Sequence, residues 1–172
     1  MSPVAPIVLL RRCADVSDAV SPCVAPGNAY LGVLLPYAPV HLLLLAANDL
    51  WVMTSANLSG APMMCEDAAA VRGLVGIADA ILVHNREIVH RVDDSVMRMT
   101  AGGRQMIRRS RGFAPMPLAL PSARECMVLA GGAELKNTFC LTRGAEAFLS
   151  EHIGDLMERS VLASYEATIA HY

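Results

Sequence analysis

The sequence has little charge imbalance and few aromatic residues. Its 172 residues carry a formal net charge of −2, and aromatic side chains make up 5% of the chain, with a single tryptophan. Proteins that bind nucleic acid usually carry excess positive charge, and those that bind single strands stack the bases on aromatic rings. The composition has neither property, so nucleic acid is not an expected partner.

Patterns typical of metal sites and disulfide frameworks are missing as well. The five cysteines are widely spread with no Cys-x-x-Cys pair, and no two of the five histidines stand three or four residues apart. These spacings offer no zinc ribbon, no helix-borne metal site and no recognisable disulfide framework. They fit a protein of the reducing cytoplasm, which is where we expect this chain to act.

Long hydrophobic runs are also absent. The longest, at 40–47, is interrupted by His41 and is far too short to span a bilayer, and residues 1–3 lack the basic start of a signal peptide. Hydrophobic residues nevertheless make up 54% of the chain and charged residues 17%. This balance predicts a packed fold with a sizeable core and excludes disorder, and the shortness of the apolar runs is the reason we expect no membrane association.

Short apolar runs separated by proline, glycine and charge predict an α/β fold for the first part of the chain. A Gly102-Gly103 turn is expected to lead into a strand at 105–108. The other expected elements are strands at 7–10, 31–35, 51–53 and 80–83, helices at 38–48 and 66–72, and a strand, turn and strand within 88–99.

Prolines mark a predicted domain boundary. We place a linker at 118–126, between a first domain at 1–117 and a second at 127–172, because clustered prolines favour an extended spacer. Three short strands are expected beyond it, at 127–130, 138–141 and 147–149, and they suggest a meander. Asp155 and Glu158 have the spacing of a capping box. The helix that follows is expected to bury one face and to leave this second domain incomplete; the predicted face consists of Leu156, Leu162, Tyr165, Ile169 and Tyr172.

A cluster of short polar side chains follows the apolar run at 50–53. Thr54, Ser55, Asn57 and Ser59 would cost about 1–3 kcal/mol each if buried without partners, so they are poor core residues. Hydroxyl and amide groups both donate and accept hydrogen bonds, and strand ends in open α/β sheets face a crevice. The cluster is therefore a candidate ligand site. The alternative is a loop that caps the next helix.

A basic cluster lies further along, at 108–111. Arg109 and Arg111 belong to it, and arginine side chains bind phosphate through paired, charge-assisted hydrogen bonds. The alternative is a strand edge protected by charge. Asp93 and Asp94 could hold a hydrated magnesium ion or pair with these arginines. We expect the polar cluster at 54–59 and the arginines to converge on one hollow.

A glycine pair at 131–132 precedes Lys136 and Asn137. The stretch matches a P-loop only weakly, because Leu135 stands where glycine should precede the lysine. A Gly-Gly turn can still approach a phosphate through backbone N–H groups, although an ordinary β-turn explains it equally well. No arrangement of serine, cysteine and histidine indicates a covalent nucleophile.

Taken together, these motifs resemble the HypF family of hydrogenase-maturation carbamoyltransferases. The resemblance covers nearly the whole chain and rests on residues 25–28, 33–37, 54–60, 84–96, 108–115, 134–141 and 150–155. It implies that the first domain is the later part of an open, twisted YrdC-like sheet with helices. The second would be the opening β-meander and helix of a TsaD-like domain, related to actin and hexokinase.

The resemblance also implies a reaction. ATP and carbamoyl phosphate would yield carbamoyl adenylate, and the carbamoyl group would pass to a C-terminal cysteine of the partner protein HypE. The implied nucleotide-binding residues are Thr54, Ser55, Asn57, Ser59, Ser95, Arg109, Lys136 and Asn137. Charge on the departing pyrophosphate would be stabilised by Arg91, Arg109 and Arg111, with Asp93 and Asp94 as candidate magnesium ligands. Such catalysis works by positioning and electrostatics.

Several parts of the family pattern are not found in this sequence. They are a lysine- and arginine-bearing segment of the YrdC-like site, the acylphosphatase-like and zinc-finger regions, and a histidine metal motif expected beyond Tyr172. Zinc or iron sites would therefore lie outside this chain, and we expect little complete carbamoyltransferase activity from it alone. The alternatives are a YrdC-type threonylcarbamoyl-adenylate synthase, an RNA- or protein-binding module, and a fragment without activity.

Overall fold

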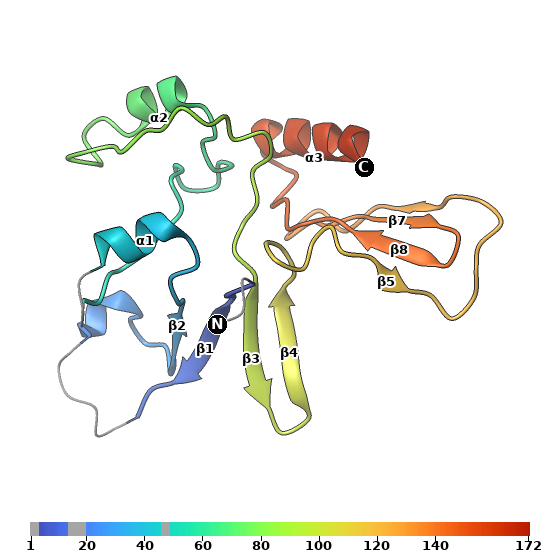
Figure 1. Ribbon diagram of the computed structural model, residues 1–172, viewed down its shortest axis with the longest axis horizontal. Coiled ribbons are helices and arrows are strands. Elements are labelled where there is room, and N and C mark those ends of the chain that lie inside the picture. The colour runs from blue at the N-terminus through green and yellow to red at the C-terminus, as the bar shows by residue number, and fades with distance from the viewer. Residues whose placement is uncertain (1–3, 14–19, 46–48) are drawn as a thin grey trace. The chain divides into compact units, whose positions relative to one another are not determined.

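The computed structural model describes residues 4–13, 20–45 and 49–172, which fall into two compact units (Figure 1). The first unit combines Met1–Met53 with Asp94–Phe113, and the second combines Thr54–Asp93 with Ala114–Tyr172. Each unit therefore draws on two separate stretches of the chain.

A four-stranded sheet forms the centre of the first unit, in the order β2-β1-β3-β4 (Figure 1). Its strands are β1 (Ile7–Arg11), β2 (Tyr30–Val33), β3 (Val96–Thr100) and β4 (Gly103–Arg108). β1 runs antiparallel to β2 and parallel to β3, with Ile7 opposite Val96. The predicted Gly102-Gly103 turn is confirmed: it joins β3 to β4, and Gly103 has a φ of 104°, which glycine adopts without a Cβ penalty.

Two short helical segments belong to the first unit. The 3₁₀ turn η1 (Pro22–Val24) begins after Ser21, whose side chain accepts a hydrogen bond from the Cys23 N–H at 3.2 Å. The helix predicted at 38–48 is present as α1 (Pro39–Leu44), and proline fixes the backbone angle of its first turn. Residues 46–48 of that prediction lie outside the described ranges.

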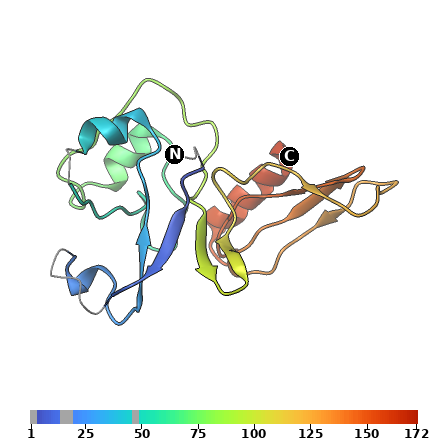
Figure 2. The same cartoon turned by 60° about the horizontal axis from the view of Figure 1, so that its bottom comes forward.

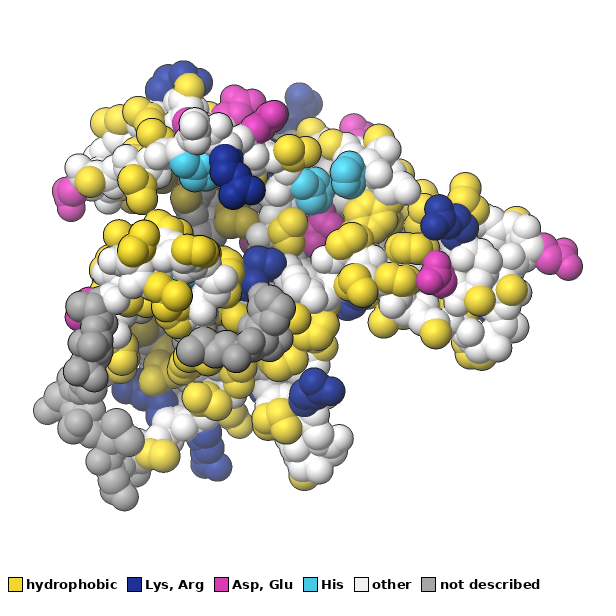
Figure 3. Space-filling view, viewed as in Figure 1, with side chains coloured by type: hydrophobic (Ala, Val, Ile, Leu, Met, Phe, Trp, Pro, Cys, Tyr) yellow, Lys and Arg dark blue, Asp and Glu magenta, His cyan; other side chains and the backbone are white. Residues whose placement is uncertain are grey.

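Much of the apolar surface of the first unit is exposed. Leu43 of α1 is 85% exposed, and hydrophobic side chains gather on the face over α1 (Figure 3). An apolar hollow of about 390 Å³ opens beside β1 and β2; it is lined by Ala5, Pro6, Val8, Leu10, Val33, Leu35 and Pro36. These side chains are apolar, as in a protein core, yet they lie at the surface of the unit.

The second unit contains an antiparallel sheet in the order β5-β8-β7-β6. Its elements are α2 (Asp67–Gly73), β5 (Leu118–Ala119), β6 (Leu129–Ala130), β7 (Cys140–Arg143), β8 (Glu146–Leu149) and α3 (Arg159–His171). The predicted meander and both predicted helices are present. β5 lies inside the segment expected to be linker, where it pairs with β8 instead of acting only as a spacer.

Phe139 is the largest buried side chain of the second unit. Its ring makes edge contacts with Tyr165 and Tyr172, at centroid distances of 5.9 and 5.2 Å. Both tyrosines come from α3 or its end, so the helix lies against this sheet (Figures 1 and 2). Ala147 and Val161 are buried as well.

The predicted start and buried face of the last helix were partly wrong. Val161 and Thr168 are buried, whereas Leu162 is exposed. The helix begins at Arg159, and no side chain caps it. Asp155 has a different task from the predicted cap, because its Oδ1 accepts a hydrogen bond from the Lys136 N–H at 2.7 Å.

Three predicted strands do not form: those at 51–53 and 80–83, and the first of the two expected within 88–99, where β3 alone is present. Val52 and Leu82 are 72% and 76% exposed, and no strand in the described ranges pairs with either stretch. Local apolar character is insufficient for a strand, because a strand is stabilised by its neighbours.

No helix in the described ranges combines the length and the hydropathy that crossing a membrane would need.

Candidate functional site

The polar cluster at 54–59 lies on an exposed loop of the second unit. The Asn57 side chain shapes this loop, since its Nδ2 donates to the carbonyls of Leu58 and Ala61, both at 2.9 Å. Gly60 completes the turn with a φ of 81°. The side chains of Thr54, Ser55 and Ser59 stand at the loop surface.

Ser95 immediately precedes β3 and is fully buried. Its hydroxyl accepts a hydrogen bond from the Ser110 N–H at 2.8 Å and donates one to the Arg111 carbonyl at 2.9 Å. These two bonds tie the end of β4 and the following turn to β3. Both the donor and the acceptor function of this hydroxyl are thus directed at the backbone of the basic cluster.

Arg111 is held from several sides within the first unit. Its Nε donates to Asp94 Oδ1 at 2.7 Å, and its two terminal nitrogens donate to the carbonyls of Val4 at 3.1 Å and Ala5 at 2.8 Å. The Tyr37 ring covers the guanidinium, with Cζ 3.5 Å from the ring centroid. These contacts join the start of β1 to the turn that follows β4.

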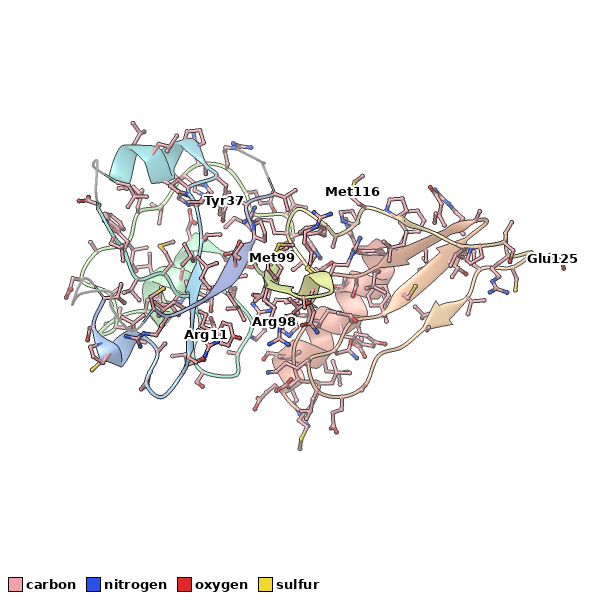
Figure 4. The ribbon with its side chains drawn as sticks, turned by 90° about the horizontal axis from the view of Figure 1, so that it is seen from below. Arg11, Tyr37, Arg98, Met99, Met116 and Glu125 are labelled. Carbon is pink, nitrogen blue, oxygen red and sulfur yellow. The ribbon has the colours of Figure 1, made fainter. Side chains whose placement is uncertain are left out.

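Tyr37, labelled in Figure 4, is thus stacked on a guanidinium that also bonds a carboxylate, and both charges act on its hydroxyl. Burial raises the pKa of its hydroxyl above the ordinary value, the Asp94 carboxylate adds to the rise, and the Arg111 guanidinium opposes it.

Arg109 and Arg91 fall in different units. The Arg109 guanidinium donates to the Phe113 carbonyl at 2.7 Å in the first unit. Arg91, in the second unit, donates to Cys65 Sγ and to Ser164 Oγ, both at 3.4 Å. Arg109 and the cluster at 54–59 also belong to different units, so their predicted convergence on one hollow stays a prediction.

Asp93 and Asp94 each have a basic partner. Asp93 Oδ2 bonds His152 Nδ1 at 2.7 Å, and Asp94 Oδ1 bonds Arg111. In the described part of the chain, no three side chains of the metal-binding types cluster. Asp94 thus pairs with one of the arginines, as the predicted alternative has it, whereas Asp93 pairs with a histidine instead; a magnesium role for the two acids stays a prediction.

The turn at 131–137 is shaped by close backbone contacts. A Cβ on Gly132 would lie 2.0 Å from the Thr138 carbonyl oxygen, so only glycine fits there. Asn137 is buried; its Nδ2 donates to the Ala133 carbonyl at 2.7 Å, while its Oδ1 has no hydrogen-bond partner among the described residues. Lys136 is exposed, and its φ is 52°.

Sequence reasoning missed a second polar cluster, in the second unit. His90 bonds the buried carboxylate of Glu151, which also accepts a hydrogen bond from the Tyr172 hydroxyl at 3.1 Å. The His90 ring stacks on His171 at a centroid distance of 5.1 Å. His90 and Glu151 are 61 positions apart, so no local spacing signals the pair.

Two family models match successive parts of the chain. The Sua5/YciO/YrdC model, described as telomere recombination, matches residues 2–110, and the HypF Kae1-like domain matches residues 123–172. The chain belongs to the Sua5/YciO/YrdC family. The first match covers the sheet of the first unit, and the second covers β6 to α3.

Curated relatives extend this family assignment. A carbamoyltransferase HypF of Rhizobium leguminosarum is 45% identical over 99% of this chain, and one of Synechocystis is 40% identical over 99%. These alignments cover 23% and 22% of the two relatives, so the chain spans about a quarter of their length. The predicted resemblance to HypF carbamoyltransferases is confirmed.

Solved structures agree with the sequence comparisons. A full-length HypF in a phosphate- and nucleotide-bound form matches with a TM-score of 0.89 and 42% identity, over 98% of this chain and 26% of that one. HypF of T. kodakarensis matches with a TM-score of 0.88 and 40% identity, over 96% and 22%. The predicted fold, a YrdC-like sheet with helices followed by the β-meander and helix of a further domain, is thereby confirmed.

Proposed function

We propose that this chain is part of a carbamoyltransferase of the HypF type. Its reaction would join ATP and carbamoyl phosphate into carbamoyl adenylate and pass the carbamoyl group to the C-terminal cysteine of HypE, in the maturation of nickel–iron hydrogenase. One observation carries the proposal: a Sua5/YciO/YrdC match and a HypF Kae1-like match follow each other in one chain. A stand-alone threonylcarbamoyl-adenylate synthase does not account for the second match.

The proposed division of the chain rests on its prolines, and the same two matches support it. We assign 1–117 to the adenylate-forming domain, 118–126 to the connection and 127–172 to the start of the transferase domain. The matched ranges, 2–110 and 123–172, leave the proline-rich segment between them. The pairing of β5 with β8 supports a connection that is itself anchored to the second sheet.

In the first domain, the proposed nucleotide contacts are exposed hydroxyl groups and one guanidinium group. Thr54, Ser55 and Ser59 present their hydroxyls at a loop surface that Asn57 holds in shape. Arg109 supplies a guanidinium for phosphate. The solved HypF in a phosphate- and nucleotide-bound form supports a nucleotide as the ligand.

Ser95 and Arg111 act in this proposal by positioning. The Ser95 hydroxyl is buried against the backbone at 110–111, and Arg111 is bonded to Asp94, Val4 and Ala5. Their task is to fix the turn that carries Arg109. Arg91 remains a candidate for stabilising the charge on pyrophosphate.

The turn at 131–137 is the proposed nucleotide contact of the second domain. Gly132 leaves no room for a side chain, and the buried Oδ1 of Asn137 is an acceptor without a partner among the described residues. Lys136 adds an exposed positive charge. Magnesium would enter with ATP, since it is usually held through substrate phosphates and only one or two carboxylates.

Calorimetric titration with ATP tests the proposal. Arg109→Ala and Ser55→Ala should each weaken binding about tenfold, the effect of losing about 1.4 kcal/mol. The controls Arg104→Ala and Ser122→Ala remove the same groups at other exposed positions and should leave affinity unchanged. If all four variants bound ATP with the affinity of the wild type, the site assignment would be wrong.

Substrate choice separates the proposed reaction from its nearest alternative. Exchange of pyrophosphate into ATP should depend on carbamoyl phosphate in a protein that contains this chain together with the remaining regions of its relatives. Exchange that depends on threonine with bicarbonate would support the threonylcarbamoyl-adenylate synthase instead. The 172-residue chain alone should show little exchange with either substrate.

A further inference from the structure

Residues 90–93 contact distant parts of the second unit through side chains. His90 bonds Glu151, Asp93 bonds His152 at 2.7 Å, and the Arg91 guanidinium donates to Ser164 of α3 at 3.4 Å. The segment itself is irregular: residues 84–93 contain no helix or strand. Its position in the unit therefore depends on these three side chains.

The surface that receives the segment contains a buried carboxylate. Glu151 is 5% exposed, one of its oxygens bonds His90, and the other accepts from the Tyr172 hydroxyl. A buried carboxylate without partners is strongly destabilising, so this surface requires a donor at the position of His90. Stacking of His90 on His171 adds an aromatic contact from the end of α3.

The contact lacks the backbone pairing that holds the sheet. Asn137 and Gly154 form a backbone bridge next to this surface, but no backbone hydrogen bond within the described ranges joins residues 84–93 to residues 150–172. Segments held by a few side chains open at lower free energy than paired strands do. The segment and the sheet should therefore open independently.

We propose that Glu151, His152 and α3 form a docking surface for the chain's own residues 90–93, a latch that opens while the sheet stays folded. The latch joins a segment of the Sua5/YciO/YrdC match to the HypF Kae1-like match, because residues 90–93 lie in the first matched range and residues 151–172 in the second. It does not depend on the proposed carbamoyl chemistry.

The chain carries its own probes of this latch. Cys65 is half-buried and accepts a hydrogen bond from Arg91, whereas Cys140 is half-buried in β7 and Cys126 is exposed. Opening of the latch should expose Cys65 alone. Unfolding of the sheet would expose Cys140 as well.

The experiment is alkylation of the full chain by iodoacetamide, with the rate at each cysteine read by peptide mass spectrometry. His90→Ala combined with Asp93→Ala should raise the rate at Cys65 at least about fivefold and leave Cys140 unchanged. The control pair is His84→Ala with Glu87→Ala, one histidine and one acid from the same stretch, both exposed. It should change neither rate.

Tyr172→Phe provides a gentler variant, since it removes only the hydroxyl that donates to Glu151. It should raise the Cys65 rate by a smaller factor, again without change at Cys140. The proposal is overturned by an unchanged Cys65 rate in the His90/Asp93 double variant, or by an equal rise in the control pair. A parallel rise at Cys140 overturns it too, because the segment and the sheet would then open as one body.

Discussion

The buried hydroxyl of Ser95 accepts a hydrogen bond from the backbone N–H of Ser110 at 2.8 Å, across the β3–β4 hairpin. The same hydroxyl donates to the Arg111 carbonyl, so one side chain fixes two successive residues of the basic cluster. From the sequence alone, a serine just before a strand is an ordinary polar residue. In the structure, its buried hydroxyl holds the backbone of the turn that carries Arg109.

Ser95→Ala should destabilise the chain by about 1–3 kcal/mol, because the Ser110 N–H loses its buried partner. Ser59→Ala, at an exposed loop position, should stay within about 0.5 kcal/mol of the wild type. Urea unfolding followed by circular dichroism measures both. A loss at Ser95 no larger than that at Ser59 would show that the hydroxyl is dispensable.

Gly112→Ala should cost more than a general glycine penalty. Gly112 has a φ of +83°, and an added Cβ would lie 2.9 Å from the Val4 Cα, a backbone atom that cannot swing away. Gly27, in the same unit, has a φ of +67° with nothing within 4 Å of the added atom. Gly27→Ala should lower the free energy of unfolding by about 1 kcal/mol, the cost of a positive φ for a residue with a Cβ. Gly112→Ala should lower it by at least about 1 kcal/mol more. Matching unfolding midpoints for the two variants would refute the close approach.

Tyr37 should make stability fall at alkaline pH. Because burial raises the pKa of this hydroxyl in the folded state, the unfolded chain loses the proton first as the pH rises above about 10. The contribution is complete below that pH and is lost between the unfolded and folded pKa values. Tyr37→Phe keeps the ring over Arg111 and should flatten this alkaline slope. Unfolding curves measured across that pH range test this prediction, with tyrosinate absorbance as a second readout. If stability fell equally steeply with pH in the wild type and in Tyr37→Phe, Tyr37 would not be the group responsible.

Phe139→Ala should be the most destabilising of these substitutions and lower the free energy of unfolding by about 3–5 kcal/mol. It removes the buried ring that packs against Tyr165 and Tyr172 and leaves a cavity. Leu135→Ala is the matched control, since Leu135 is 63% exposed and its truncation leaves no buried cavity. Thermal unfolding should separate the two by many degrees. Similar melting temperatures would mean that Phe139 does not form the centre of that core.

Elements encoded by adjacent residues were predictable from the sequence. The β3–β4 hairpin follows from its glycine pair, and the meander follows from short apolar runs with glycine turns. The apolar run at 51–53 was misread as a strand, because pairing depends on a neighbour that local pattern does not specify. Asp155 was misread as a cap, because its true partner, the Lys136 N–H, lies 19 positions away.

The same limit applies to the candidate site. The motifs predicted the correct family, whereas the ligand site read from 54–59 and the phosphate contacts read from 108–111 stay predictions. The individual roles of Ser95 and Arg111 were not visible, because their partners are set by the fold. The contact between His90 and Glu151 could not be predicted from the sequence. The two residues are 61 positions apart, and only the fold brings their side chains together.

The parallel pairing of β1 with β3 also has a consequence for how the chain is made. Ile7 emerges from the ribosome long before Val96, its register partner, has been translated. Throughout that interval the side of β1 that β3 later covers is an open strand edge, available to other nascent chains. An expressed piece that stops before Val96 would keep that edge permanently, and one that stops before Arg108 would leave β3 without its full β4 partner, so recombinant boundaries should be placed beyond the end of β4.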